Sequence, residues 1–497
     1  PRTSPRLVTG LLGVSLFAFA LAPMPSTATD FVWDGQFNGL WDTEFPFGPG
    51  STLTNWNPDG PIPNPIPDSD DTATFNLATP YTTIDLNGSR TVGALSFGGT
   101  TGYTLGPAGD KLTLGSGDLT TTGSATHTIN CKIGLGGTGD WSIGSNLEVH
   151  AEISGAHGLN KTGNGSLTLS EINLYTGVTN VSAGTLIVTN SSYTATGTGD
   201  LNVHSGATIS GSGRAGGDWT IASGAKVTPG GSSIGTLRAR EAVDLNGTYE
   251  CQIDGTQRDR LLVTGHLDLG GGTLDLSTSN LTEDLYVVAT YDSVTGSPTV
   301  NNLPAGFTFH TSLPSGFASA NGVSSKSVAL VRDTTPPVIT LQGADPTEVF
   351  AYYETYTEEG ATANDNFDGN VTVTIGGDTV DPSTLGTYLV TYDATDSHGN
   401  AAVQVTRTVV VIPPAFNEAL GTDAGNALTT GTWNVMLGDD AAFNLSSSSK
   451  NVLIGNYTGF LINRSSGSDA DRNVLVGFRA AGGYTQAEWD AFQADPT

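Results

Sequence analysis

Apolar residues alternate with polar residues along most of the chain, which is the period of two that half-buried β-strands show. The alternation is clearest in residues 158–188, where the apolar positions are Leu167, Leu169, Val181, Leu186 and Val188. A glycine-containing break at residues 175–177 separates two strand-like runs. Such a segment cannot bury its apolar face alone, so the pattern predicts copies stacked above and below it. We interpret residues 158–188 as one turn of a β-solenoid.

Three further segments repeat one template, in which an apolar–polar–apolar run is followed by a Ser/Gly turn and a second alternating run. They begin at Trp141, Leu201 and Trp219, and the last two starts are 18 residues apart. Strands of about five residues joined by short turns and spaced about 4.8 Å apart would fit a turn of that length. The sequence therefore predicts an all-β protein whose residues 29–332 form a right-handed parallel β-helix.

Tryptophans precede the regular alternation. Trp33, Trp41 and Trp56 lie before or within a stretch that becomes rich in proline at residues 57–71. An uncapped solenoid would expose apolar side chains and unpaired strand edges, and prolines stop the addition of strands. We expect this segment to cap the start of the coil.

A different strand pattern begins after the proline-containing linker at residues 333–337. It predicts five short strands, at residues 338–341, 348–352, 371–375, 387–392 and 402–411. In the last strand, one face would carry Val403, Val405, Val409 and Val411. Five strands in about 80 residues suit a small immunoglobulin-like β-sandwich over residues 333–412.

A second repeat occupies residues 413–483. Its copies end in glycine, and Gly421, Gly438, Gly455 and Gly477 are 17, 17 and 22 residues apart. One short strand per repeat is too little to stand alone, so neighbouring repeats or neighbouring chains must bury it. We predict a C-terminal β-repeat segment there, and a capping box at Thr485 predicts a short helix over residues 484–497.

Residues 1–28 resemble a secretory signal peptide, with two arginines, an apolar run and a small-residue cleavage site. No later run is apolar enough to enter a membrane. Because the chain opens on Pro1 and stops at Thr497 without an anchor, we expect a longer protein. The 19 basic and 48 acidic residues give a net charge of −29, which disfavours nucleic acid and anionic membranes as partners. The 66 glycines favour turn-rich β structure over disorder.

The chain contains few residues that suggest catalysis. The two cysteines, Cys131 and Cys251, lie in alternating strands, so we expect inward-facing apolar side chains instead of a disulfide. The sequence has no HExxH, GxSxG or nucleotide-binding motif. The strongest charged cluster comprises Asp254, Arg258, Asp259 and Arg260. A solvated turn with local ion pairs explains it more simply than paired catalytic carboxylates.

Calcium is the ion that the sequence favours. Asp365, Asp368 and Asn370 supply oxygen atoms at alternating positions in a turn, and a second loop with Asp393 and Asp396 could approach them. The twelve-residue calcium loop and its closing Glu are absent. Turn-capping by Asp and Asn explains the same residues, so both interpretations stay open. No other cofactor is expected.

Three segments resemble known families. WDGQFNGLWD, DTATF, TVGALSF and LNKTGNGSLTLSEINLYTGVTNVSAGTLIV resemble exported bacterial proteins with autotransporter-associated β-strand repeats, over residues 30–332. DTTPPVITL and GTYLVTYDATDSHGNAA resemble bacterial immunoglobulin-like domains. The NVxxG copies after residue 413 resemble repeats of trimeric adhesins and phage-type fibres, which implies a homotrimer through residues 413–483. The first resemblance implies a β-helical passenger without catalytic residues.

We therefore predict a secreted or cell-surface, non-enzymatic structural or adhesion protein. Its partners would be surface glycans, surface proteins or further copies of itself, bound through many weak contacts. The alternative is a carbohydrate-active enzyme, a lyase or hydrolase, or a carbohydrate-binding protein on the same solenoid. The ligand, the export route and the anchoring stay open.

Overall fold

The computed structural model describes residues 30–33, 41, 45–46, 52–53, 56–58, 67–351, 354–412, 416–426, 428, 431–443, 445, 448–459 and 472–480. The predicted signal peptide at residues 1–28 and the predicted helix at 484–497 lie outside them. Contacts divide the chain into two units, Pro1–Asp333 and Thr334–Thr497.

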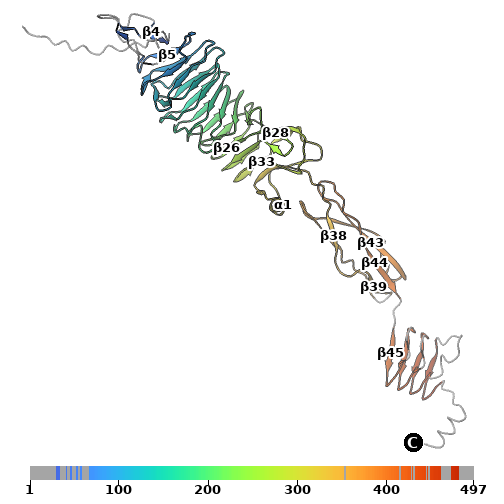
Figure 1. Cartoon of the computed structure of the whole chain (residues 1–497). Coiled ribbons are helices and arrows are strands. Elements are labelled where there is room, and N and C mark those ends of the chain that lie inside the picture. The colour runs from blue at the N-terminus through green and yellow to red at the C-terminus, as the bar shows by residue number, and fades with distance from the viewer. Residues whose placement is uncertain are drawn as a thin grey trace, which may run out of the picture. The chain divides into compact units, whose positions relative to one another are not determined.

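The first unit is a coil in which most turns contribute one strand to each of three walls (Figure 1). The first wall is a 13-stranded sheet, parallel except at its last strand. In sheet order its strands are β34 (Ser293–Thr295), β31 (His266–Asp268), β27 (Val243–Leu245), β24 (Trp219–Ile221), β21 (Leu201–Val203), β19 (Thr179–Val181), β17 (Leu159–Thr162), β14 (Gly139–Ile143), β11 (Leu119–Thr121), β8 (Ala94–Phe97), β5 (Thr72–Phe75), β1 (Asp30–Trp33) and β4 (Trp56–Pro58).

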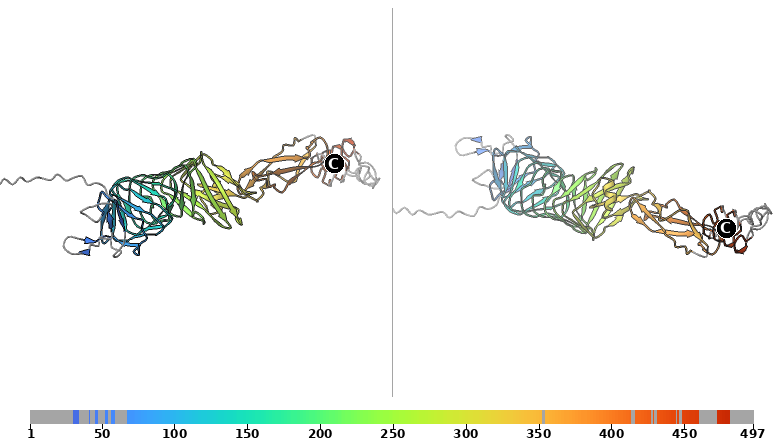
Figure 2. Two further views of the ribbon diagram at one scale, coloured as in Figure 1. Left: turned by 90° about the horizontal axis from the view of Figure 1, so that it is seen from above. Right: turned by 90° about the horizontal axis from the view of Figure 1, so that it is seen from below.

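The second wall has 12 strands, and Figure 2 shows the stack from two further sides. Its strands are β35 (Thr299–Asn301), β32 (Thr273–Ser279), β28 (Thr248–Asp254), β25 (Lys226–Pro229), β22 (Ala207–Gly211), β20 (Gly184–Val188), β18 (Ser166–Leu169), β15 (Leu147–Val149), β12 (His127–Ile129), β9 (Thr104–Gly106) and β6 (Thr83–Asp85), with β29 (Gln257–Arg258) paired to β28.

The third wall is divided into two sheets. The four-stranded sheet contains β16 (Ile153–Ser154), β13 (Lys132–Leu135), β10 (Lys111–Leu114) and β7 (Arg90–Val92). The six-stranded sheet contains β23 (Arg214–Ala215), β26 (Thr236–Ala239), β30 (Arg260–Val263), β33 (Leu285–Thr290), β37 (Ser327–Val331) and β36 (Thr308–His310). A separate hairpin joins β2 (Phe45–Pro46) to β3 (Thr52–Leu53).

The strand register confirms a parallel β-solenoid. Leu201 pairs with Trp219, so the predicted turn of 18 residues is real. The interpretation of residues 158–188 as a single turn is wrong, because Lys161 of β17 pairs with Val181 of β19 on the next turn. The segment spans two turns, and each of them lacks a strand in the third wall. Because each turn contributes only two short strands, the two turns together looked like one in the sequence.

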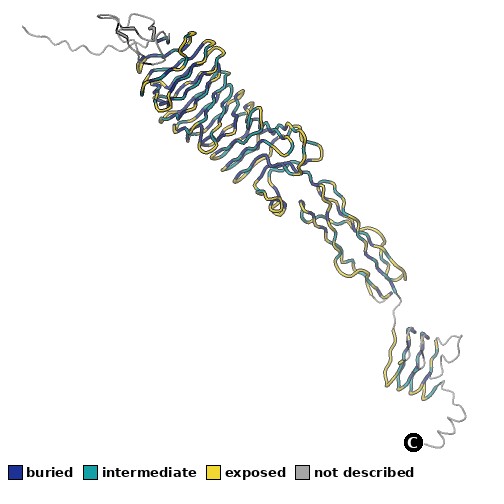
Figure 3. The backbone as a smooth tube through the Cα atoms, in the orientation of Figure 1, coloured by how far each residue is buried: buried dark blue, intermediate teal, exposed yellow. Residues whose placement is uncertain are grey.

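The interior of the coil consists of columns of aligned, buried side chains. Figure 3 shows how buried positions alternate with more exposed ones along the backbone. Each column takes one residue from each turn, so removal of a side chain affects the turns above and below. One column of the first wall, no more than 1% exposed, contains Leu95, Leu119, Trp141, Lys161, Val181, Val203, Ile221 and Leu245. Cys131 and Cys251 are buried and free, as expected.

Asn173 replaces strand pairing where the third wall is interrupted. Its side chain is 1% exposed. Oδ1 accepts the backbone N–H of Ile153 on the preceding turn at 2.6 Å, and Nδ2 donates to the carbonyl of Ala195 on the next turn at 2.5 Å. One amide therefore bridges three turns through backbone groups that a strand would otherwise satisfy.

Antiparallel strands end the coil on both sides. At the start, β4 pairs antiparallel with β1, and the rings of Trp33 and Trp41 lie 5.8 and 5.9 Å from that of Phe75. At the other end, β37 pairs antiparallel with both β33 and β36, and the short helix α1 (Ser315–Ala320) lies between β36 and β37 in sequence. These strands interrupt the parallel register, which hinders the addition of another turn.

The Ig-like module in the second unit is a sandwich of two sheets. One contains β38 (Val338–Leu341), β40 (Ala361–Asp365) and β41 (Gly369–Val371), and the other contains β39 (Thr347–Phe350), β44 (Val405–Ile412), β43 (Gly386–Ala394) and β42 (Val373–Gly377). The sequence predicted five strands where the structure has seven. Strand β40 escaped prediction because its inward face carries only Ala361, Ala363 and Asp365, which are not strand-favouring residues.

The last strand of the module also differs from the prediction. Val403 precedes β44 and is 83% exposed, so it does not belong to the predicted inward face. Arg407 occupies that face instead, next to Val409 and Val411, and is only 1% exposed. The predicted inward face is therefore correct for Val409 and Val411 and wrong for Val403, and the burial of Arg407 was not predicted.

The C-terminal repeats form a parallel four-stranded sheet of β45 (Asn417–Leu420), β46 (Asn434–Leu437), β47 (Val452–Ile454) and β48 (Val474–Val476). A column of asparagines, Asn417, Asn434, Asn451 and Asn473, links the repeats, each Nδ2 donating to the preceding Oδ1 at 2.8–3.0 Å. The glycine after each strand has a φ between 125° and 134°, a conformation that favours glycine.

Candidate functional surface

The first wall of the solenoid presents a column of outward-facing amides. Asn160 donates to Asp140, Asn180 donates to Asn160, and Asn202 donates to Asn180, with N···O distances of 2.8–2.9 Å. Strand pairing puts these residues in register on four successive turns. Because each amide is held by its neighbour, the column offers donors and acceptors at regular spacing in fixed orientations.

The second wall presents a column of hydroxyl side chains, interrupted by Lys226, at the equivalent outward position. The register aligns Ser166, Thr185, Thr208, Lys226, Thr248, Thr273 and Thr299 on successive turns. Thr299 is exposed and the other threonines are half-buried, which leaves part of each side chain in solvent. We call these residues the threonine column. Such a surface can make many weak polar contacts with an extended partner.

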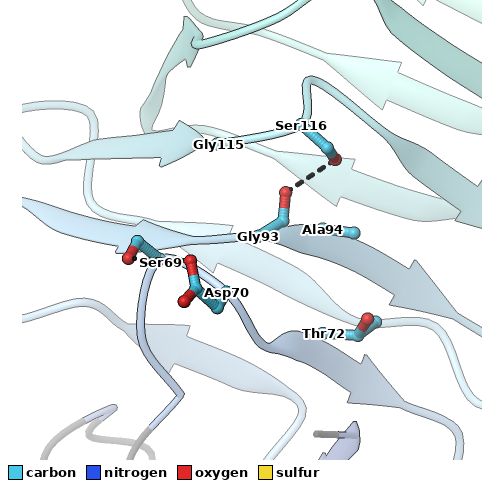
Figure 4. A pocket seen from close by; sticks show the side chains of 7 residues that line it. All are labelled: Ser69, Asp70, Thr72, Gly93, Ala94, Gly115 and Ser116. Atoms are coloured by element: carbon cyan, nitrogen blue, oxygen red, sulfur yellow. Dashed lines mark hydrogen bonds between the residues drawn. The ribbon is translucent and has the colours of Figure 1, made fainter. Parts of the chain in front are cut away.

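Two hollows on the solenoid are open to solvent and have mixed polar and apolar linings. Figure 4 shows one that crosses three turns and is lined by Ser69, Asp70, Thr72, Gly93, Ala94, Gly115 and Ser116. Ser116 Oγ donates to the carbonyl of Gly93 at 2.8 Å, which joins two of these turns. Asp70 contributes the one carboxylate of this lining. Glycoside hydrolysis generally needs two carboxyl groups facing one bond, and the described lining of this hollow contains one.

The charged cluster at residues 254–260 is distributed between surface and interior. Asp254 accepts hydrogen bonds from Ser279 and Asn280 at 2.8 Å, and these bonds lower its pKa. Asp259 is fully buried and accepts the N–H groups of Gln252 and Gly235. Burial raises the pKa of Asp259 to about 6, despite those hydrogen bonds.

Arg258 donates to the carbonyls of Val287 and Thr256. The hollow beside this cluster contains Asp254 as its only carboxylate among the described residues. The hydrogen bonds of Asp254, Arg258 and Asp259 therefore mainly link this segment to the neighbouring turns, at Ser279, Val287 and Gly235. The predicted solvated turn with local ion pairs is wrong for Asp259, which is buried and accepts backbone N–H groups.

Besides Asp259, two further ionisable residues inside the coil were not predicted to be buried. Lys161 is fully buried and donates from Nζ to three backbone carbonyls, and burial lowers its pKa to about 8. His127 is stacked on Phe97 with ring centroids 4.8 Å apart, and burial lowers its pKa to about 4. Both residues occupy positions at which the alternating pattern of their strand expects an apolar residue. This pattern could have identified them as buried.

The residues predicted to bind calcium lie in the Ig-like module. Asp365 ends β40, Asp368 lies in the following turn, and Asn370 is an exposed residue of β41 that pairs with Asn364. Asp365 Oδ1 accepts the N–H groups of Phe367 and Asp368 at 2.7 and 2.9 Å. This is the turn-capping arrangement that the sequence had left open as an alternative.

Of the two acidic residues predicted in the second loop, Asp396 lies near the other carboxylates and Asp393 does not. Asp393 lies on β43 and accepts two hydrogen bonds from Gln404 at 3.0 Å. Asp396 has ligand atoms within 4.8 Å of those of Asp368 and His398, and it also approaches Asp365. His398 was not among the predicted residues, because a histidine alone in a turn carries no ligand signal.

Parts of the chain match two families and one known protein. Residues 159–188 match the passenger-associated-transport-repeat family, and residues 339–411 match the bacterial surface protein Ig-like domain. The adhesin BmaC autotransporter of Brucella suis biovar 1 (strain 1330) is 28% identical over 299 residues. The aligned region is 58% of this chain and 8% of that relative, so the chain spans a small part of its length.

These matches confirm the resemblance to exported passenger repeats followed by a bacterial Ig-like domain. They also confirm a secreted or cell-surface location. Within the described residues, no helix is long and apolar enough to cross a membrane.

Proposed function

We propose that this chain is a non-enzymatic adhesion and structural segment that binds through the walls of its solenoid. The observation that carries the proposal is the alignment of outward polar side chains on successive turns. Columns of amides and hydroxyls fixed at strand spacing suit an extended partner that repeats the same weak contact, and many such contacts together give avidity.

Surface glycans and surface proteins are the partners that this chemistry favours. Both present dense hydroxyl, amide or carbonyl groups, which can exchange hydrogen bonds with Thr, Ser and Asn. The acidic net charge of −29 disfavours strongly anionic partners. The relative named as an adhesin supports the same class of function for the aligned region.

The experiment measures binding of the whole chain, displayed on beads, to a glycan array and to wells coated with extracellular-matrix protein. In the test variant, Thr208→Val, Thr248→Val and Thr273→Val remove three hydroxyls of the threonine column and keep the β-branched shape. We expect at least a tenfold loss of bead retention. The matched control makes the same change at Thr198, Thr256 and Thr282, which are exposed and outside the strands.

Two results would contradict the proposal. One is a wild-type chain that binds none of these surfaces, and the other is a threonine-column variant that binds as well as the control variant. Incubation of the chain with a polysaccharide panel addresses the enzymatic alternative. Release of reducing ends or unsaturated products above a heat-denatured control would favour that alternative.

We also propose that the C-terminal repeats assemble three copies of the chain. Leu420, Val474, Val476 and Phe478 are 62–72% exposed, so this small sheet leaves apolar side chains uncovered. Neighbouring copies would cover them. Sedimentation of the whole chain should give three times the 51.0 kDa protomer mass. The paired variant Val474→Asp, Val476→Asp should sediment as a monomer, and a monomeric wild type at micromolar concentration would refute the assembly.

A further inference from the structure

In the Ig-like module, Asp396 lies close to two other carboxylates, those of Asp365 and Asp368, on the opposite loop. Asp365 is the last residue of β40, Asp368 lies in the turn between β40 and β41, and Asp396 lies in the loop after β43. Ligand atoms of Asp368, Asp396 and His398 lie within 4.8 Å of one another. A carboxylate oxygen of Asp365 also lies within 4.8 Å of one from Asp396. The two loops come from the two different sheets of the sandwich.

One oxygen of this group is buried without a partner. Asp365 is 7% exposed, and its Oδ1 accepts two backbone N–H groups. Its Oδ2 has no hydrogen-bond partner among the described residues. A buried carboxylate oxygen left in this state is costly, because it has lost water and gained nothing in return. Turn-capping therefore explains Oδ1 of Asp365 but not Oδ2.

Basic side chains do not neutralise these acids. Residues 334–412 contain eleven acidic residues, no lysine and one arginine, Arg407. Arg407 forms its ion pair with Glu358. Asp365, Asp368 and Asp396 form no ion pair with any Lys or Arg that the structure describes. Asp396 is also only 7% exposed, so two adjacent buried carboxylates lack a Lys or Arg counter-ion among the residues that the structure describes.

We propose that Asp365, Asp368 and Asp396 bind one Ca²⁺ ion. Carboxylate oxygens in flexible loops are the ligands that Ca²⁺ prefers, and its variable coordination tolerates an irregular set completed by water. Asp396 takes the place that the sequence gave to Asn370, which lies on β41. The ring of His398 is held edge-on against Phe367, with centroids 5.0 Å apart, and flanks the carboxylates.

The ion would link the two sheets of the module. It would hold the β40–β41 turn against the loop after β43, and both loops would become more rigid when calcium is present. An extracellular module of this kind would bind in the range of about 10⁻⁴ to 10⁻³ M.

The experiment uses the chelator-treated whole chain with CaCl₂ as the titrant, in 0.1 M KCl with excess Mg²⁺ to suppress weak binding to the acidic surface. Calorimetry should give one saturable Ca²⁺ site. Hydrogen exchange should slow in residues 365–370 and 395–400. Asp365→Asn keeps the turn-capping oxygen but removes the charge, and we expect at least a tenfold weaker affinity. Asp368→Asn, at a less buried position, should weaken binding as well.

Asp381→Asn is the matched control. Asp381 caps a turn in the same module, accepting hydrogen bonds from Ser383 and Thr384, but it lies outside the carboxylate group. This variant should bind Ca²⁺ as the wild type does. Exchange of β43 and β44 amides verifies that each variant is folded. Three outcomes would overturn the proposal. Hydrogen exchange of both loops is the same with and without Ca²⁺, the wild type and both site variants bind Ca²⁺ with equal affinity, or the loops are protected by Zn²⁺ but not by Ca²⁺.

Discussion

The solenoid and the Ig-like module bury charged groups in different ways. In the solenoid, Lys161 lies alone in an apolar column, and its Nζ donates to the carbonyls of Thr162, Gly163 and Ala183. In the module, Arg407 is buried beside Glu358, with Nη1 2.7 Å from Oε1. Backbone carbonyls alone thus satisfy the buried charge of Lys161, whereas Arg407 has an opposite charge beside it in addition to two backbone carbonyls.

This difference follows from how each region is built. Every solenoid turn meets only its neighbours, so stability is close to a sum of similar interfaces, and one polar defect is tolerated locally. The module has a core cluster of six buried apolar residues, Val349, Ala351, Val390, Tyr392, Val409 and Val411. A core this small depends more strongly on each buried polar pair. Mutations should therefore have local effects in the solenoid and effects on the whole module in the sandwich.

The largest effect should come from Arg407→Met. The substitution leaves Glu358 without its cation and frees the carbonyls of Gln342 and Gly360, to which Arg407 Nη2 donates. Breaking a buried pair by removing one partner costs about 3 to 5 kcal/mol. This loss of stability should make hydrogen exchange faster in the amides of all of β43 and β44.

Arg332→Met is the control for that variant. Arg332 Nε lies 2.8 Å from Asp284 Oδ1, but the two side chains are 35% and 62% exposed. Exposed pairs contribute about 0 to 1 kcal/mol, so this change should be small. If the two variants lost the same amount of stability, the burial of the Arg407–Glu358 pair would not be the reason for its contribution.

Leu167→Ala tests the local response of the solenoid. Leu167 is fully buried, with Leu147 on one side and Leu186 on the other. Removing a buried leucine side chain costs about 2 to 5 kcal/mol. Exchange should accelerate in β15, β18 and β20, while β28 and β32 keep their protection.

The outward neighbour on the same strand, Thr168→Ala, supplies the comparison and should change exchange little. A uniform loss of protection through the whole coil after Leu167→Ala would refute the nearest-neighbour description.

The sequence was sufficient to predict the fold where the same short structural unit repeats along the chain. The 18-residue spacing from Leu201 to Trp219 gave one turn of the coil, because neighbouring turns bury the same alternating face. It failed at Lys161, where a lysine occupies a position that Trp141 and Val181 fill on adjacent turns. Periodicity identifies the inward position but cannot reveal that nearby carbonyls will accept a charged side chain there.

The site in the module was only partly predictable for a related reason. Asp365 and Asp368 are neighbours in sequence, so their shared turn was visible. Asp396 reaches them from the other sheet, and its loop could be suggested but not placed without the sandwich topology. Asp393 lies three residues earlier, on the strand, and binds Gln404 instead.

A pH titration should reveal the cost of burying Lys161. Its folded pKa of about 8 is below the ordinary 10.5, so the unfolded chain holds the proton more tightly. Stability should therefore rise as the pH increases from about 8 to 10.5, by up to about 3 kcal/mol. Urea midpoints of wild type relative to Lys161→Met measure this gain. If both proteins respond equally to pH, the lysine is not responsible.

The smallest effect should come from the surface pair Lys226–Glu250. Lys226 Nζ lies 2.6 Å from Glu250 Oε1, yet the side chains are 52% and 37% exposed. Strand pairing puts Glu250 opposite Asp275, so the lysine also offsets repulsion between two acids. Lys226→Met should cost about 0.2 to 1 kcal/mol, because water and ions screen exposed charges.

That cost should shrink further in 1 M salt, where the screening length is about 3 Å. The measurement is the difference in urea midpoint between wild type and Lys226→Met at low and high salt. A loss as large as that of Leu167→Ala, and insensitive to salt, would mean that surface charge pairs hold the turns together. A small, salt-sensitive loss would instead indicate that the buried apolar columns stabilise the coil. Side chains on the outer walls would then be available for binding a partner, because they contribute little to stability.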